Sequence, residues 1–270
     1  MAQPLLDSEH NHPYPLPKDL GAIDRLDLQH YAIQQATQER YHVPLSTPKN
    51  IIDIGAGSGA WILEMAKEFP ESEITGIDIT PLRPSTTLPA NCKFEVGNVL
   101  EGLPHADGTF DYVRQCLLVT ALANEKWQPH VVECARICAS GGWVEMSETN
   151  CALYGGGSAW QRLNGMISKA FLSRGLNPEK TETLEELMRE AGLVDITAKK
   201  YEIPVGSRGG KAGELFLTNI RMGTLALVPL YKSVFGMSQE DVEQLLAQMD
   251  EEIEQHEVHV VLRIFAGRKP

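Results

Sequence analysis

The sequence predicts an α/β protein built on a doubly wound, mostly parallel sheet. Short apolar segments alternate with helical segments from residue 51 to residue 147, and such alternation is typical of parallel strands joined by crossover helices. The first apolar segment, Ile51–Ile54, ends directly in a glycine-rich stretch at residues 55–59, and a helical pattern follows it. A strand, a glycine turn and a helix in this order indicate a ligand-binding turn at the end of the first strand.

Apolar periodicity places the elements in order along the chain. The first helix is expected over residues 22–41, where Leu26, Tyr31 and Ile33 follow near-helical spacing and Pro44 closes the segment. The other expected helices cover residues 58–69, 125–139, 159–174, 181–191, 211–235 and 238–255. The expected strands cover residues 51–54, 73–79, 92–96, 110–118, 143–147, 193–205 and 258–267. Gly141 and Gly142 are expected to end the helix over residues 125–139.

The chain divides into two parts of different character. Residues 1–45 hold a polar, proline-rich arm over residues 1–20 and then the first helix, while residues 46–270 form the main domain. Two helical stretches, about 155–190 and 208–255, interrupt the strand pattern in the second half. Because they precede the last strand, we expect them to form a helical cap over the ligand site.

Composition and charge argue against several functions. The 270 residues carry a formal net charge of −12, and no run of Lys and Arg supplies the basic face that duplex nucleic acid or an anionic membrane attracts. No apolar run approaches the roughly 20 residues that span a bilayer, and no early apolar segment resembles a signal peptide. We expect a cytoplasmic protein without nucleic-acid or membrane partners. A monomer and a homodimer both stay open.

The cysteines indicate neither a disulfide framework nor a metal site. The chain has five cysteines, an odd number, and no Cys-x-x-Cys pair. Cys134 and Cys138 lie one helical turn apart, a spacing that small apolar residues on a packed helix explain. No histidine belongs to a Ser/His/Asp or metal-ligating pattern. We therefore expect no bound metal.

Glycine at alternate positions of the stretch Gly55–Ala56–Gly57–Ser58–Gly59 has a physical purpose. It permits the unusual backbone angles of a tight turn and lets a ligand approach the main chain closely. The spacing Gly-x-Gly-x-Gly departs from the dinucleotide fingerprint, although a dinucleotide domain remains the alternative. A second strand ends in Asp78, whose carboxylate can accept both hydroxyls of an adenosine ribose. Asn98 follows the third strand, where it can meet an adenine edge or simply form a turn.

These segments resemble the class I S-adenosylmethionine-dependent methyltransferases over roughly residues 22–150. The segments 102–111 and 136–145 look like the family's turns into its fourth and fifth strands. The resemblance implies a seven-stranded, Rossmann-like sheet whose last strand, residues 258–267, runs antiparallel. Residues 25–31 look like the N-terminal helix of a subgroup common in microbial and fungal secondary metabolism. In that subgroup this lid helix lies across the cofactor site.

The resemblance also implies roles for individual residues toward S-adenosylmethionine. The residues that it assigns to the methionine portion and the ribose are Tyr31, Asp53, Gly55, Ala56, Gly57, Gly59 and Asp78. Ile79, Asn98 and Val99 are expected at the adenine, and Gln115 is expected to border the sulfonium. Two positions depart from the family: Asn98 stands where many members have Asp, and Arg114–Gln115–Cys116 stands where relatives often carry His-Gln-Arg.

The acceptor side is less defined than the cofactor side. Four residues of the cap are candidates for acceptor contact: Tyr154, Trp160, Asn219 and Met222. His30 and Glu148 are the candidates for a catalytic base, although a solvent-exposed His30 is an equally good interpretation. The predicted activity is in-line methyl transfer to a small-molecule acceptor of secondary metabolism. Two alternatives remain: a cyclase or pericyclase of the same fold that keeps the cofactor as a bystander, and a regulatory methyltransferase-like protein that binds a protein partner.

Overall fold

The computed structural model describes residues 20–270, apart from the side chains of residues 20, 22 and 23. The expected arm over residues 1–20 therefore lies almost entirely outside the described residues. The described chain forms an eight-stranded sheet in the order β3-β2-β1-β4-β5-β8-β6, with β7 paired to β8. The strands are β1 (Asn50–Ile54), β2 (Glu73–Asp78), β3 (Cys92–Val96), β4 (Phe110–Cys116), β5 (Cys138–Thr149), β6 (Tyr154–Gly155), β7 (Val194–Pro204) and β8 (Val258–Arg268).

The strand directions confirm the predicted fold class. Strands β1 to β5 pair in parallel, and β8 runs antiparallel to both β5 and β7. The sheet has one strand more than the seven that the sequence pattern predicted. This additional strand is the short β6, which pairs with β8 through Tyr154 and Gly155. Two residues are too few for an alternating apolar pattern, so only the neighbouring strand reveals β6.

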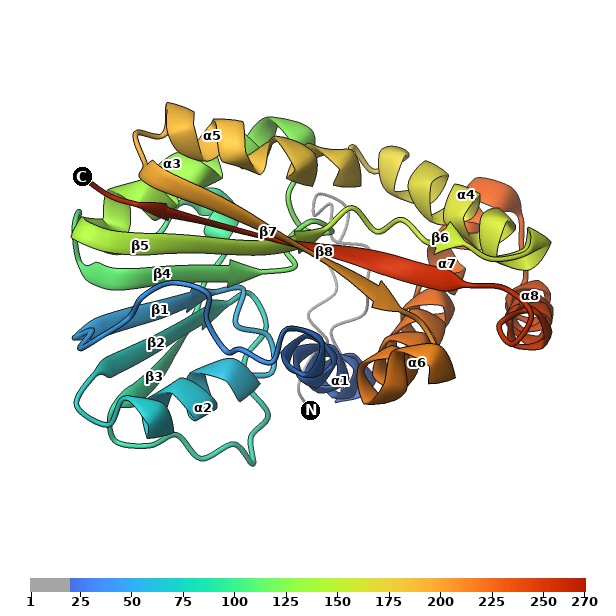
Figure 1. The fold of residues 1–270 in the computed structure, drawn as a ribbon, viewed down its shortest axis with the longest axis horizontal. Coiled ribbons are helices and arrows are strands. Elements are labelled where there is room, and N and C mark those ends of the chain that lie inside the picture. The colour runs from blue at the N-terminus through green and yellow to red at the C-terminus, as the bar shows by residue number, and fades with distance from the viewer. Residues whose placement is uncertain (1–19) are drawn as a thin grey trace, which may run out of the picture.

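Helices cover both faces of the sheet (Figure 1). The α-helices are α1 (Leu20–Thr37), α2 (Ala60–Glu68), α3 (Trp127–Ile137), α4 (Ser158–Leu172), α5 (Leu184–Glu190), α6 (Gly210–Ala226), α7 (Val228–Phe235) and α8 (Gln239–Glu252). Helices α3 and α5 pack on one face around Trp127 and Leu184, and α2 packs on the other around Ile62. The sheet thus has an apolar layer on each side, as a doubly wound fold requires.

A third apolar cluster forms the core of a helical cap. It joins α4, α6, α7 and α8 to one another and to the ends of β7 and β8, with Trp160 and Tyr231 fully buried inside it. The cap lies beyond the carboxyl ends of the parallel strands (Figure 1). Helix α5, which was expected as part of the cap, instead packs beside α3 on the sheet.

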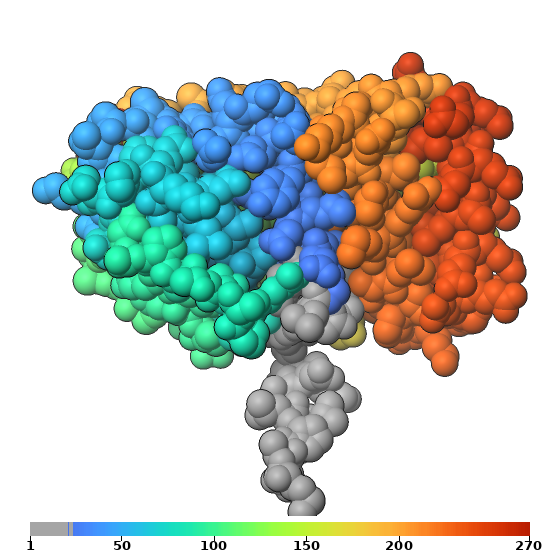
Figure 2. Space-filling view, turned by 90° about the horizontal axis from the view of Figure 1, so that it is seen from below, coloured from blue at the N-terminus to red at the C-terminus, as the bar shows by residue number. Residues whose placement is uncertain are grey.

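Helix α1 lies between the sheet and the cap. It packs against α6, and its residues Ala32 and Ile33 belong to the apolar core of the cap. Figure 2 shows its blue surface between the cyan and green surface of the sheet domain and the orange surface of α6. Helix α1 therefore lies across the carboxyl ends of the strands, where the lid helix was expected.

Two predicted boundaries differ from the structure for clear physical reasons. The helix expected over residues 211–235 is two helices, because Pro229 lies in the first turn of α7 and cannot continue the hydrogen bonding of α6. Gly141 and Gly142 do not lie beyond a helix end but within β5, which begins at Cys138. A register shift opposite Phe110 and Tyr112 accommodates them in the strand.

Candidate active site

The glycine loop, residues 55–59, turns back over the end of β2. Gly55 and Gly57 have φ values of 72° and 55°, in the left-handed region that favours glycine. A Cβ on Gly55 would lie 2.4 Å from Cδ2 of Leu118, so this position has no room for a side chain. The backbone N–H groups of Gly55 and Ala56 donate to the carbonyl of Ile77 at 2.8 and 3.0 Å. Backbone hydrogen bonds thus hold the loop against the neighbouring strand.

Asp78 ties the same loop through its side chain. Its Oδ2 accepts a hydrogen bond from the Gly57 N–H at 2.9 Å, and its Oδ1 accepts one from the Thr80 N–H at 2.8 Å. A carboxylate in this position is also the kind of group that accepts hydrogen bonds from hydroxyls. Asp78 therefore lies where its predicted role places it, at the carboxyl end of β2 and beside the loop.

The loop forms one wall of a cavity of about 460 Å³, including its opening to solvent, here called the loop cavity. Helix α1 and the end of β4 form the other walls. The lining residues are Leu26, Gln29, His30, Ile33, Asp53, Gly55, Ala56, Gly57, Ser58, Ala60, Trp61, Arg114, Cys116 and Leu117. Most of the glycine loop and Asp53 thus face one space, whereas Gly59 lies outside it as the N-terminal cap of α2.

A buried ion pair crosses the floor of the loop cavity. Nη1 of Arg114 lies 2.7 Å from Oδ1 of Asp53, and the guanidinium lies 4.4 Å from the centre of the Trp61 ring. Burial raises the pKa of Asp53, although the charge of Arg114 acts against it. The two residues are partners in the pairing of β1 with β4. Sequence reasoning assigned no binding role to Arg114 because strand register cannot be read from a single sequence.

Gln115 and Glu148 do not line the loop cavity; they form a buried polar brace with His130. Nε2 of Gln115 donates to Oε1 of Glu148 at 2.7 Å, and Nε2 of His130 lies 2.6 Å from Oε1 of Gln115. Glu148 also accepts hydrogen bonds from the backbone N–H groups of Leu118 and Val119. The brace holds the chain that follows β4, so Gln115 and Glu148 act behind the cavity wall, and Glu148 is not a candidate base.

The brace is electrostatically unusual because it has no access to solvent. Burial raises the pKa of Glu148 to about 8, although its three hydrogen-bond donors favour the ionised form. Burial lowers the pKa of His130 to about 4, so its ring is neutral at pH 7. Because Oε1 of Gln115 can only accept, Nε2 of His130 carries the ring proton and donates it.

The two predicted site residues on α1 have different surroundings. His30 lines the loop cavity, and its Nε2 lies 3.4 Å from Oε2 of Glu64. Burial, followed by the charge of Arg114, lowers the pKa of His30. Tyr31 is 46% exposed and does not line the cavity. Helical geometry explains the difference, because consecutive residues point about 100° apart.

The predicted adenine residues lie at the ends of β2 and β3. Ile79 directly follows β2, and Asn98 and Val99 follow β3, all three half-buried. Oδ1 of Asn98 accepts a hydrogen bond from the Leu100 N–H and caps a short 3₁₀ helix. The turn role considered for Asn98 is thus present, and contact of these residues with adenine stays a prediction.

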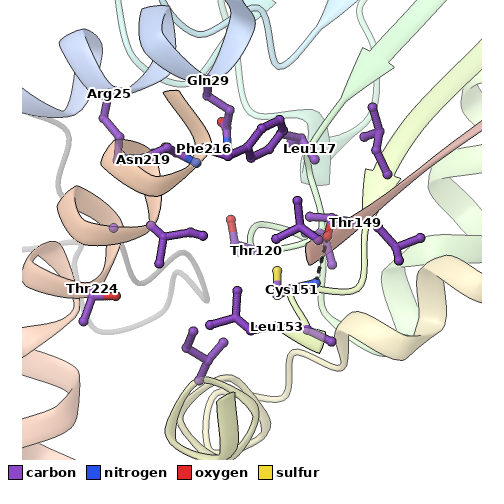
Figure 3. Close-up of a pocket in the computed structure, with 18 of the residues that line it drawn as sticks. Arg25, Gln29, Leu117, Thr120, Thr149, Cys151, Leu153, Phe216, Asn219 and Thr224 are labelled. Carbon is purple, nitrogen blue, oxygen red and sulfur yellow. Dashed lines mark hydrogen bonds between the residues drawn. The ribbon is translucent and has the colours of Figure 1, made fainter. Parts of the chain in front are cut away.

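A second and larger space, here called the cap cavity, adjoins the loop cavity. It encloses about 1030 Å³, including its opening, between α1, α4, α6 and the ends of β4, β5 and β8. The two cavities share four lining residues: Leu26, Gln29, Ile33 and Leu117. Figure 3 shows that the labelled side chains around it come from segments far apart in the sequence.

Of the four predicted acceptor contacts, only Asn219 lines the cap cavity. Trp160 is fully buried in the cap core and donates its indole N–H to the carbonyl of Met249 at 3.1 Å. The ring of Tyr154 stacks on that of His259, and its hydroxyl accepts a hydrogen bond from Asn150. Met222 is half-buried outside the cavity lining. Trp160 and Tyr154 therefore hold the cap together, a distinction that helical periodicity cannot make.

Three features of the described residues concern metals, disulfide bonds and membranes. No group of three or more His, Cys, Asp or Glu side chains within residues 20–270 has the arrangement of a metal site. All five cysteines are free. Among the helices that the structure describes, none is long and apolar enough to cross a bilayer.

Fold and site together define a Rossmann-like enzyme of the S-adenosylmethionine-dependent type, and comparison with known proteins agrees. A family model described as "Methyltransferase domain" matches residues 51–142. Methyltransferase str3 of Strobilurus tenacellus is 32% identical over 200 residues, which cover 72% of this chain and 71% of str3. Methyltransferase pytC of Aspergillus terreus is 27% identical over 279 residues, covering 97% of this chain and 85% of pytC. The chain belongs to the S-adenosylmethionine-dependent methyltransferases.

A solved structure supports the fold. Phosphoethanolamine N-methyltransferase 2 of Haemonchus contortus, in complex with S-adenosyl-L-methionine, matches with a TM-score of 0.53 at 17% identity. The match covers 92% of this chain and 52% of the nematode protein, so this chain spans about half the length of that enzyme. At this identity the likeness concerns the fold alone.

The residues of the loop cavity fit S-adenosylmethionine, the cofactor of the family. The methionine portion carries an ammonium and a carboxylate, and the cavity presents the opposite charges in Asp53 and Arg114. Nε of Arg114 is buried and has no hydrogen-bond partner among the described residues. A buried guanidinium with an unpaired N–H favours an anionic ligand. We therefore expect Arg114 to contact the cofactor carboxylate. Asp78 lies outside the lining of the loop cavity, and its contact with the ribose hydroxyls stays a prediction.

Asp78→Ala should weaken the binding of S-adenosylhomocysteine by at least about tenfold, because it removes a charged acceptor of two hydroxyls. Titration calorimetry measures the affinity. Asp78→Asn is the matched control, since it keeps one acceptor oxygen and should lose less. Equal affinity of the Ala variant and the parent protein would contradict the role given to Asp78.

His130 should lower the stability of the protein on acidification, whereas Glu148, whose pKa is raised, acts in the opposite direction. The pKa of His130 is lowered to about 4 in the folded state from its ordinary value of 6.5, so the unfolded chain binds more protons between these values. Between pH 7 and pH 5 this difference removes about 2 kcal/mol from the free energy of unfolding. Urea unfolding of the parent protein and of His130→Gln, which keeps a donor but does not titrate, measures the effect. Identical pH dependence in the two proteins would rule it out.

Proposed function

We propose that this enzyme transfers the methyl group of S-adenosylmethionine to an apolar small molecule held in the cap cavity. The observation that carries the proposal is the wall shared by the two cavities. Leu26, Gln29, Ile33 and Leu117 line both, so a ligand in each would meet at this boundary. Proximity and alignment of this kind supply much of the rate enhancement of a displacement between two substrates.

The chain contributes alignment and exclusion of water to this reaction. The bound cofactor supplies a methyl group that its sulfonium has already activated. Helix α1 covers both cavities, and its apolar residues Leu26 and Ile33 keep water from the shared boundary. The brace of Gln115, Glu148 and His130 fixes the chain that carries Leu117. The site thus positions two ligands with side chains that do not react.

The cap cavity has no evident general base. Its described lining contains no carboxylate, histidine or lysine, and burial raises the pKa of its only thiol, Cys151, to about 12. His30 lines the loop cavity alone, with its ring beside Glu64. An acceptor whose attacking atom is already ionised, or needs no deprotonation, suits such a site. Of the two catalytic candidates from the sequence, His30 and Glu148, we retain His30.

A small-molecule acceptor fits the surface better than a protein partner does. The large apolar side chains that are exposed on the described residues lie on separate elements: Tyr31, Val96, Val132, Leu172, Val194, Leu225 and Val234. Single exposed apolar side chains of this kind are ordinary on a protein surface and do not by themselves indicate a protein partner. An acceptor from secondary metabolism is in keeping with the fungal methyltransferases to which the chain is similar. A cytoplasmic location and a monomeric or homodimeric state stay predictions.

Incubation with labelled S-adenosylmethionine and a panel of apolar phenols, carboxylic acids, amines and thiols tests the proposal. We expect formation of S-adenosylhomocysteine together with a methylated acceptor. Conversion of an acceptor without S-adenosylhomocysteine would instead indicate the cyclase alternative. Cofactor binding without turnover of any acceptor would favour the regulatory alternative.

Gly223→Leu should reduce methyl transfer by at least about tenfold, because a side chain there enters the cap cavity. Gly223 lines that cavity on α6, and a Cβ added to it meets no atom within 4 Å. Gly165→Leu is the matched control, since Gly165 is also helical and open but lies outside the lining. S-adenosylhomocysteine affinity should stay unchanged in both variants. An equal loss of activity in the two variants would contradict the placement of the acceptor.

A further inference from the structure

Arg25 is a buried cation in the wall of a cavity whose other described lining residues are uncharged. It lies on α1, is only 6% exposed and lines the cap cavity. Figure 3 shows Arg25 and Gln29 extending from α1 toward Asn219 and Phe216 of α6. The other polar residues of the lining are neutral: Gln29, Thr120, Thr149, Asn219 and Thr224. The cavity thus combines an apolar interior with one positive charge.

This cation has no anionic partner among the described residues. Its hydrogen bond to Asn219 is long, 3.4 Å from Nη1 to Oδ1. Asp24 and Asp27 are close in sequence, but their carboxylates face Arg83. Arg114, the other buried arginine of the two cavities, has the carboxylate of Asp53 at 2.7 Å. A ligand would therefore have to supply the counter-ion of Arg25, whereas Arg114 already has one in Asp53.

A buried guanidinium without a counter-ion is costly unless a ligand provides one. Removal of a cation from water carries a large penalty that an anion in contact offsets. The planar guanidinium suits a carboxylate or another oxyanion, to which it can donate two parallel hydrogen bonds. Arg25 is thus suited to bind an anion that enters the cap cavity.

The position of Arg25 assigns this anion to the acceptor and not to the cofactor. Arg25 lines the cap cavity alone, whereas the loop cavity has its own cation in Arg114. The apolar lining around Arg25 requires that the rest of the ligand be apolar. Residues Ile167, Phe171 and Leu227 extend this apolar surface away from α1.

We propose that the acceptor is an apolar molecule with an oxyanion, such as a carboxylate or an ionised enol or phenol, that pairs with Arg25. The proposal rests on the proposed function and adds the chemical class of its acceptor. It also agrees with a cavity that lacks a general base, since an ionised acceptor arrives without the proton that a base would remove. Arg25 is then a specificity-determining residue.

A pair of fluorescent probes separates charge from apolar contact. 8-Anilinonaphthalene-1-sulfonate carries an anionic group, and N-phenyl-1-naphthylamine is the same aromatic body without it. Binding of each is measured on the full chain, saturated with S-adenosylhomocysteine, for the parent protein, Arg25→Met, Arg25→Lys and Gly223→Leu. Arg25→Met removes the charge and keeps the length, Arg25→Lys keeps the charge, and Gly223→Leu fills the cavity. Thermal unfolding of each variant confirms that it folds.

We expect the parent protein to bind the sulfonate more tightly than the neutral probe. Arg25→Met should weaken sulfonate binding by about tenfold and leave neutral-probe binding within about twofold, while Arg25→Lys retains most of the preference. Gly223→Leu should weaken both probes, which locates them in the cap cavity. Because removal of an unpaired buried charge relieves desolvation, Arg25→Met should unfold at the same or a higher temperature.

Three results would overturn the proposal. The first is a parent protein that binds neither probe or both equally, and the second is an Arg25→Met variant in which both affinities change alike. The third is a loss of S-adenosylhomocysteine affinity in Arg25→Met with unchanged sulfonate binding. This result would indicate that Arg25 binds the carboxylate of the cofactor. Failure of the proposed function is a separate result, namely no S-adenosylhomocysteine formed with any acceptor.

Discussion

The packing of α1 across the carboxyl ends of the parallel strands is the constraint on which both cavities depend. Leu26 lies against the glycine loop, where a Cβ on Gly57 would come within 3.2 Å of its Cδ1. Ile33 packs into the apolar core of the cap. One helix thus closes the loop cavity on one side and the cap cavity on the other. Without a close approach between α1 and the loop, both ligand spaces would open to water.

Buried polar groups give these spaces their chemical character. Asp53 and Arg114 place a negative and a positive charge in the loop cavity, and Arg25 places a positive charge in the cap cavity. Glu148 and His130 are buried as deeply but face away from both spaces, where they hold the chain after β4. Burial makes each of these groups costly without a partner, and of the two arginines only Arg25 lacks a carboxylate partner among the described residues.

The sequence was most informative where the candidate site depends on consecutive residues. The glycine loop and Asp78 could be recognised because glycine spacing and a strand that ends in a carboxylate are local patterns. Prediction was less successful for Gln115, Glu148 and Trp160, whose residue types suit a ligand site but whose side chains are buried behind one. Arg114 was passed over for the opposite reason, since its pairing with Asp53 depends on the register of β1 against β4.

The sequence by itself determined the class of fold and, through its resemblance to a methyltransferase family, the cofactor. The fold class follows from hydrophobic periodicity, and the resemblance rests on the glycine loop and on Asp78 at the end of the second strand. Only the tertiary structure decided which side chains face the acceptor, because the cap cavity is formed by α1, α4, α6 and three strand ends that are distant in the chain. Residue types show what a side chain can bind, but burial and the distance to a counter-ion show whether it is free to do so.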